Sequence, residues 1–242
     1  RVALPYAALA ARHGALEAVP HVQEAGWRSG FGNDRLQVGM MKITQDGSLQ
    51  GYSGALTEGY HDRPDETGML LIPQPTFDTV VAQALAAGIQ VGTHANGDRA
   101  IDSTLDAYER ALELQAEKSG QNSATLIPIY HKLSAIEIKR ERFDRALDHA
   151  TRALAIAETH SSADSPEMVT AELQAASANR YAGNLGEAET QFKHAIEAQR
   201  EIEASTLTEA VALNGLAYLH LEAGRLQEAL INVEQSLAIF DE

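Results

Sequence analysis

A histidine at the end of a predicted strand is the strongest chemical signal in the first half of the sequence. Residues 89–91 read as a short apolar strand, His94 follows, and a glycine-containing turn leads into a helix that starts near Ala100. A (β/α) fold places metal ligands there, because its active site is built from the carboxyl ends of the strands. The other interpretation of His94, taken alone, is a buried histidine that is hydrogen-bonded in a turn.

Four sequence segments occur in order and at compatible spacing between residues 36 and 112. They are Val38-Gly39-Met40-Met41-Lys42-Ile43, then Asp46-Gly47-Ser48-Leu49-Gln50-Gly51-Tyr52, then Leu56-Thr57-Glu58 with Tyr60, and finally Thr93-His94-Ala95-Asn96-Gly97-Asp98-Arg99-Ala100. Together they resemble amidohydrolase family 3, which comprises metal-dependent hydrolases. The resemblance implies a TIM-barrel-type fold, and one or two divalent metals held by histidines, an acidic residue and often a carboxylated lysine.

By this resemblance, His94 is the expected histidine ligand and Lys42 is a second metal ligand, whose carbamate could bridge two metals. The alternative for Lys42 is a strand-end lysine that reaches solvent. If the chain is active, we expect a divalent metal, zinc first, which lowers the pKa of bound water and polarises a scissile carbonyl. The implied reaction is hydrolysis of non-peptide C–N bonds in amides and related compounds.

Several ligands of the family are missing from this sequence. No His-x-His pair occurs on an early strand, and neither the histidine expected soon after residues 99–117 nor a late-strand aspartate has a counterpart. Two candidate ligands are too few, because a catalytic metal uses about three protein donors. Enzymatic activity is therefore uncertain, and the alternative for the cofactor is that no metal binds this chain.

The predicted elements of the first half form an α/β segment. They are helices over residues 4–18, 76–87 and 99–117, strands over 36–44 and 89–93, and a long loop over 47–75. Only two or three strand–helix units are visible, whereas a closed barrel needs eight. We therefore expect an incomplete TIM-barrel-type segment over residues 1–117.

The composition changes near residue 120, since 14 of the 18 glycines precede residue 121. The polar stretch 118–123 is the expected linker, and residues 124–242 are expected to be all-α. Equivalent alanines recur there at Ala146, Ala188 and Ala229, which are 42 and 41 residues apart, and an amphipathic helix precedes each. This pattern resembles tetratricopeptide repeats (TPR) of the longer kinesin light chain type, and predicts an α-solenoid of three helix pairs.

Stacked helix pairs of this kind form a concave groove lined by the first helix of each pair. We expect a protein or peptide partner in this groove. The candidate groove residues are polar or aromatic, and for each the alternative is plain solvated helix surface; they are His131, Ser177, Arg180, Asn214 and Tyr218.

The charge of the chain restricts its partners. Its net charge of −15 argues against nucleic acid and anionic membranes, because both require clustered Lys and Arg. No apolar run approaches the roughly 20 residues of a membrane span. The sequence has no cysteine, which excludes disulfides and is consistent with the cytoplasm. Because it begins at Arg1 without methionine, we expect a fragment or a processed product.

The sequence therefore predicts an amidohydrolase-like fragment fused to a TPR protein-interaction module, catalytically incomplete by itself. The alternative is a TPR adaptor that binds proteins or peptides and carries a non-catalytic N-terminal appendage. Hydrolysis that depends on His94 would favour the first hypothesis, and partner binding by residues 124–242 would favour the second.

Overall fold

The chain folds into two compact units, Arg1–Gln121 and Asn122–Glu242, which are described separately. The computed structural model describes residues 2–33, 35–202 and 206–241. Helix α4 of the first unit runs to Ser119 and the first turn of the second unit begins at Ala124, so the predicted linker 118–123 overlaps the end of α4. Within the described ranges, no helix has both the length and the apolar character that a membrane crossing requires.

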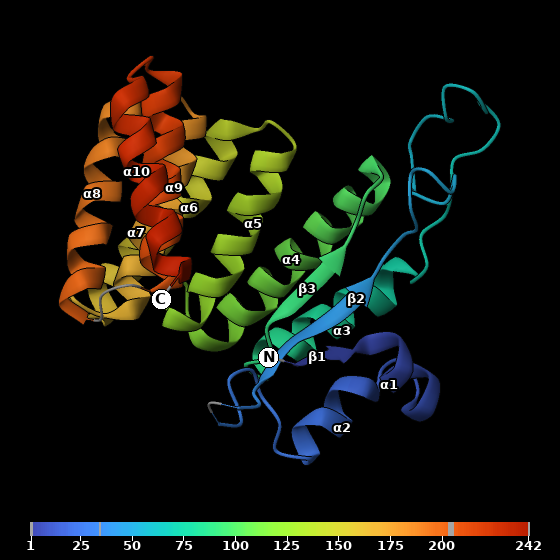
Figure 1. Cartoon of the computed structure of the whole chain (residues 1–242). Coiled ribbons are helices and arrows are strands. Elements are labelled where there is room, and N and C mark those ends of the chain that lie inside the picture. Colours follow the sequence, from blue (N-terminus) through green and yellow to red (C-terminus); the bar gives the residue numbers. More distant parts are fainter. Residues whose placement is uncertain (1, 34, 203–205, 242) are drawn as a thin grey trace. The chain divides into compact units, whose positions relative to one another are not determined.

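A small parallel sheet organises the first unit (Figure 1). Its strands β1 (Val2–Pro5), β2 (Val38–Thr44) and β3 (Val91–His94) lie in sequential order, and both neighbouring pairs are parallel. Met41 and Ile43 are fully buried, whereas Met40 is 39% exposed. Since side chains alternate along a strand, Met41 and Ile43 share one face of the sheet and Met40 and Lys42 share the other.

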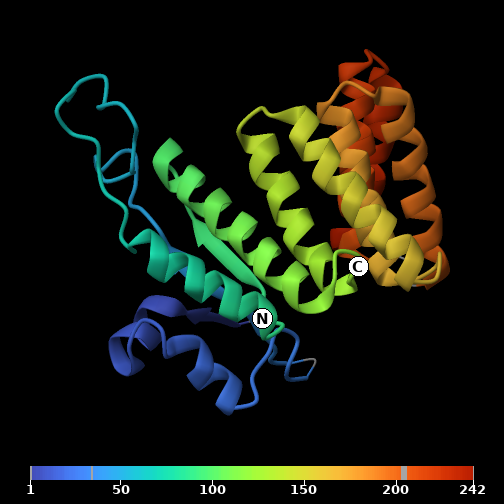
Figure 2. The same ribbon diagram turned by 180° about the vertical axis from the view of Figure 1, so that it is seen from behind.

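Three helices connect these strands, and a fourth follows β3. They are α1 (Tyr6–His13), α2 (Ala18–Glu24), α3 (Gln74–Ala86) and α4 (Asp98–Ser119). Helices α3 and α4 pack against each other, and Figures 1 and 2 show both on one face of the sheet. In Figure 1 the opposite face of β2 and β3 is turned toward the viewer, with no helix in front of it. This open face carries the candidate residues of the first unit.

The predicted helix over residues 4–18 is wrong. Val2, Leu4 and Pro5 instead form β1 and pair with β2. The helical apolar spacing is used only by the eight-residue α1, which ends at Gly14 with a positive φ of 98°. Pro20 lies in the first turn of α2, where its missing N–H needs no partner. Pairing with a strand more than 30 residues away outweighed the local pattern.

The second unit consists of three helix pairs, preceded by a short 3-10 helix, η1 (Ala124–Leu126). The pairs are α5 (Ile127–Lys139) with α6 (Phe143–His160), α7 (Pro166–Tyr181) with α8 (Leu185–Ile202), and α9 (Leu207–Glu222) with α10 (Leu226–Asp241). Ala146, Ala188 and Ala229 are buried between paired helices, where small side chains let helices approach closely. A small parallel sheet with helices, followed by a helical repeat solenoid, is the fold class that the sequence predicts.

The turn inside each helix pair has one residue in the left-handed region. Gly183 and Gly224 fill this position in the second and third pairs, with φ values of 83° and 73°. In the first pair the same position is Glu141, with a φ of 57°. A side chain in this conformation is strained by about 1 kcal/mol, so the first turn is the least favourable of the three.

Candidate functional site

The two candidate metal ligands of the first unit lie on neighbouring strands. Lys42 pairs with Gly92, and Thr44 pairs with His94, so Lys42 and His94 project on the same, open face of the sheet. His94 is the last residue of β3, as expected, and Lys42 lies two residues before the end of β2. The sheet therefore brings both residues to one side, near the carboxyl ends of the strands.

The imidazole of His94 already has protein partners. Its Nε2 lies 2.9 Å from Nδ2 of Asn96 and 3.3 Å from the carbonyl oxygen of Gly47. A neutral His94 protonated on Nδ1 accepts from the Asn96 amide, whereas the other tautomer donates to Gly47. The side chain is 37% exposed, so a ligand could reach it from solvent. Asn96 is a partner that the sequence did not single out.

Asp46 holds the long loop against the turn between β3 and α4. Its carboxylate is fully buried and accepts hydrogen bonds from the backbone N–H groups of Ala55, Asn96 and Gly97, at 2.8 to 3.2 Å. One oxygen lies 4.0 Å from His94 Nε2. Three backbone donors share this one acceptor, and two of them, Ala55 and Gly97, are buried, so Asp46 is chiefly a structural residue.

Two further residues of the same motif fasten the loop. The carboxylate of Asp98 accepts from the backbone N–H of Thr57 at 2.8 Å and of Arg99 at 3.0 Å. Burial raises the pKa of Asp98, but these hydrogen bonds outweigh it and leave that pKa below its ordinary value. The backbone of Gly97 approaches Ala55 so closely that an added Cβ would lie 1.9 Å from the Ala55 oxygen. The motif around His94 thus shapes the loop.

The described residues do not complete a coordination shell for a catalytic metal. Nowhere in residues 2–33, 35–202 and 206–241 does a group of three or more His, Cys, Asp or Glu side chains lie together so that it could hold a metal ion. Asp46 is committed to backbone donors, which leaves His94 and Lys42. Such a pair falls short of the three protein donors of a typical catalytic site.

An apolar cavity of about 510 Å³ lies at the carboxyl ends of β1 and β2. It adjoins Thr44, the residue in register with His94. The other lining residues are mostly apolar: Tyr6, Ala7, Ala15, Leu71, Ile72, Pro73 and Thr76. Neither Lys42 nor His94 lines this cavity, and none of its lining residues is charged.

The structure separates the five candidate groove residues of the second unit. His131 on α5 is largely buried, its Nε2 has no hydrogen-bond partner, and burial lowers its pKa to about 4, with a smaller contribution from Lys132. Ser177 and Arg180 lie on α7, and Asn214 and Tyr218 lie on α9. Of the five, His131 is the least suited to contact a partner, because its ring is shielded from solvent.

Arg180 and Tyr218 come together between two repeats. The guanidinium of Arg180 stacks 4.1 Å from the ring centroid of Tyr181 and lies 5.7 Å from that of Tyr218. It also forms an ion pair with Glu222 at 2.5 Å. Tyr218 is 60% exposed, so it presents an aromatic surface backed by a fixed cation.

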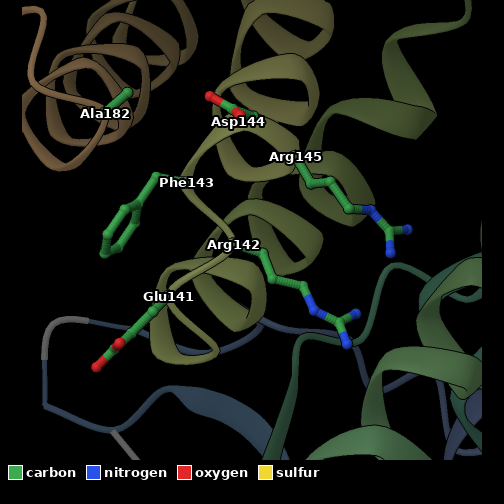
Figure 3. Close-up of a pocket in the computed structure, with 6 residues that line it drawn as sticks. All are labelled: Glu141, Arg142, Phe143, Asp144, Arg145 and Ala182. Carbon is green, nitrogen blue, oxygen red and sulfur yellow. The ribbon is translucent and has the colours of Figure 1, made fainter.

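A second cavity, of about 410 Å³, lies at the turn of the first helix pair (Figure 3). Phe143 lines it and stacks on Tyr181, with ring centroids 5.8 Å apart. Figure 3 shows Arg142 and Arg145 extending away from Phe143. Both arginines pair with the buried carboxylate of Glu137, at 3.9 and 3.0 Å. These two arginines therefore neutralise a buried acid.

Comparison with known families agrees with this division. The profile of the Amidohydrolase family matches residues 3–143. Two Tetratricopeptide repeat profiles match residues 129–167 and 167–242. The first and second matches overlap over residues 129–143, which comprise most of α5, the turn after it and the first residue of α6.

Individual relatives match different parts of the chain. The Bacillus subtilis protein named "Putative amidohydrolase YtcJ" is 35% identical over 75 residues, which are 31% of this chain and 14% of that relative. A Podosopora anserina structure, described as a kinesin light chain with nearly identical TPR-like repeats, has a TM-score of 0.52 at 14% identity, covering 97% of this chain and 90% of that one.

A Rap protein solved in complex with Competence and Sporulation Factor has a TM-score of 0.51 at 16% identity, over 70% of this chain and 44% of that one. These two structures share the fold alone. The chain spans only about a seventh of the length of the curated amidohydrolase relative. Because the family profile covers more than half of the sequence, the chain belongs to the amidohydrolase family, and its second half consists of tetratricopeptide repeats.

Proposed function

We propose that this chain acts as a protein-recognition module through its repeat unit, and that its amidohydrolase unit does not hydrolyse an amide by itself. The observation that carries the proposal is the contrast between the two candidate sites. Lys42 and His94 lack a third donor among the described residues, whereas α7 offers Ser177 beside Arg180 on a regular helical surface.

The chemistry of the repeat unit favours a basic partner. Residues 122–242 contain 19 acidic and 10 basic side chains. An acidic surface attracts Lys- and Arg-rich segments and rejects acidic ones. The Rap protein of similar fold was solved with a bound factor, which supports recognition as a use of this architecture.

A displayed library of peptides, selected on the full chain, tests the recognition proposal. We expect enriched sequences to be basic, and we expect Ser177→Arg to reduce their binding at least tenfold, because it places bulk and positive charge in the groove. Thr190→Arg, on the exposed side of α8, is the matched control and should bind normally. Failure to enrich any sequence, or equal binding by both variants, would reject the groove.

A second candidate function is a hydrolase that another polypeptide completes. It is favoured by the position of Lys42 and His94 on one open face, where a partner could add the missing donors. Native mass spectrometry of the chain, with zinc added in stoichiometric amount, distinguishes the two. Tight zinc retention that is lost in His94→Ala but kept in His61→Ala supports the assembled hydrolase. A cytoplasmic location also remains part of the proposal, and cell fractionation tests it.

A further inference from the structure

The last helix pair exposes two apolar stripes. On α10, Leu226, Leu230, Val233, Leu237 and Phe240 follow a 4-3-4-3 spacing and are 37% to 65% exposed. On α9 the same spacing joins Leu207, Val211, Asn214, Tyr218 and Leu221, whose four apolar or aromatic members are 54% to 66% exposed. Both stripes contribute to a cavity of about 520 Å³ between α9 and α10. We call these ten residues the terminal face.

This spacing is that of a helix bundle. Apolar residues that alternate three and four apart form the seam along which two helices pack at a small angle. Two neighbouring antiparallel helices with such seams supply half of a four-helix bundle. A contiguous apolar surface of this kind is unusual on a monomer and marks an interaction site.

The equivalent stripe on α8 is covered by the next helix pair, and its side chains are buried. Phe192 and Ile196, which lie 41 residues before Val233 and Leu237, are only 1% and 6% exposed because α9 packs on them. The ring of Phe192 lies against Gly215, where an added Cβ would be 2.4 Å away. None of the described residues covers the terminal face in this way.

The terminal face also differs from the internal interface in charge. Ion pairs close the contact between the second and third helix pairs: Arg180 with Glu222, Glu189 with Arg225, and Arg200 with Glu209. In the third pair the counterparts of Arg180 and Glu189 are Leu221 and Leu230. The counterpart of Arg200 is Asp241. At two of these three positions a further helix pair of the same kind would therefore meet leucine in place of a charged partner, so the surface that matches this part of the face is apolar too.

We propose that the terminal face joins two copies of this chain in a symmetric dimer, in which α9 and α10 of each copy form a four-helix bundle. The same face of a second copy is apolar at the same positions, with Asn214 as its one polar member. Two charged residues beside it, Glu222 and Arg225, are already paired within their own chain. A two-fold contact between identical patches closes on itself and does not continue into a filament.

Asn214 fixes the alignment of this dimer. It is the third of five residues in the α9 stripe and lines the cavity together with Val233, the third residue of the α10 stripe. If the two-fold axis of the dimer passes through the layer of Asn214 and Val233, the Asn214 amides of the two copies meet and can hydrogen-bond to each other. One polar residue in an apolar seam selects register and oligomeric state, because other alignments bury an unpaired amide.

Sedimentation of the full chain at increasing concentration measures the dimer. We expect a reversible transition from 26.1 kDa to twice that mass. Leu230→Glu should weaken association by roughly 100-fold or more, because symmetry buries two carboxylates. Higher salt should strengthen the dimer, since both copies are acidic and the contact is apolar. A chain that stays monomeric throughout would overturn the proposal.

Single cysteines test the alignment, because the natural chain has none. Asn214→Cys should form a covalent dimer under mild oxidation, whereas Thr190→Cys, exposed on α8, should not. Circular dichroism confirms that each variant is folded, and Leu230→Glu added to Asn214→Cys should suppress the cross-link. Equal cross-linking at both positions, or a cross-link that survives Leu230→Glu, would contradict this interface.

The dimer and the groove can be separated experimentally. In this proposal Asn214 and Tyr218 belong to the dimer contact, while Ser177 stays in the groove. Leu230→Glu should therefore leave peptide binding unchanged, and Ser177→Arg should leave the dimer intact. Loss of both properties in one folded variant would contradict the separation.

Discussion

The two units of this chain use their polar residues in opposite ways. In the amidohydrolase unit a few buried groups, above all Asp46, hold a long irregular loop through backbone hydrogen bonds. In the repeat unit, ion pairs between side chains, such as Glu189 with Arg225, close an interface whose centre is apolar. The difference shows that buried polar groups shape a loop in the first unit, whereas charged side chains join neighbouring helix pairs in the second.

The largest expected effect is in the first unit. Asp46→Ala leaves three backbone N–H groups, two of them buried, without their acceptor, which we expect to lower the free energy of unfolding by about 4 kcal/mol. Denaturant unfolding followed by Trp27, the only tryptophan, reports on this unit. Asp62→Ala, on the exposed part of the same loop, is the control. Similar midpoints for both variants would show that Asp46 does not fasten the loop.

The corresponding test of the second unit removes an apolar contact. Phe192→Ala takes a fully buried ring away from Gly215, and should cost about 3 to 4 kcal/mol. Loss of far-UV circular dichroism on heating measures the change, because most helices belong to this unit. Phe31→Ala, which truncates a ring that is 51% exposed, should cost less than about 1 kcal/mol. A small effect at Phe192 would mean that the repeats do not depend on this contact.

The response to pH sharpens the comparison within the repeat unit. Burial lowers the pKa of His131 to about 4, whereas the unfolded chain protonates it near 6.5. Stability should therefore be lost as pH falls between about 6.5 and 4, by on the order of 3 kcal/mol in all. His131→Gln should flatten this part of the stability curve, as measured by denaturant midpoints at each pH.

The stability that His194 contributes changes with pH in the opposite direction. Its hydrogen bond to Glu172 raises its pKa, so the stabilisation is present below about 6.5 and is lost as pH rises through the folded pKa. His194→Gln should therefore weaken the protein at low pH more than at high pH. The same slope in both histidine variants would contradict the assignment of His131 as a buried, neutral side chain.

The smallest expected effect is a gain in stability. Glu141→Gly replaces a side chain in the left-handed region by the residue that the other two turns use, which should stabilise the first helix pair by about 0.5 to 1 kcal/mol. The melting temperature should rise by a few degrees at most. Gly183→Ala is the converse control and should lower it. A decrease for Glu141→Gly would indicate that the Glu141 side chain makes a contact that outweighs the strain.

Local patterns were sufficient for the repeats and for part of the sheet. The alanines at 146, 188 and 229 revealed the helix pairs because each pair is a local unit whose helical spacing is continuous. Local spacing does not predict strand β1, because its four residues are defined by pairing with β2. The fold class was therefore predictable, and the start of the first unit was not.

The candidate site likewise has features that the sequence predicts and features that it does not. The sequence placed His94 at a strand end, and the parallel register brings it to the face of Lys42. It could not show that Asn96 and Gly47 already contact the His94 ring, because these contacts depend on the path of the loop. His131 was expected on a surface, but its burial comes from packing between helices. The metal role of Lys42 and His94 stays a prediction.

The three hydrogen bonds at Asp46 have a consequence for movement. The carboxylate of Asp46 binds the loop over residues 45–73 through the N–H of Ala55. It also binds the residue before α4 through the N–H of Gly97. The loop therefore cannot swing open like a hinged flap unless α4 loosens at the same time. We therefore expect the loop to stay in place at this point. The amide hydrogens of Ala55 and Gly97 should exchange with deuterium slowly and at similar rates.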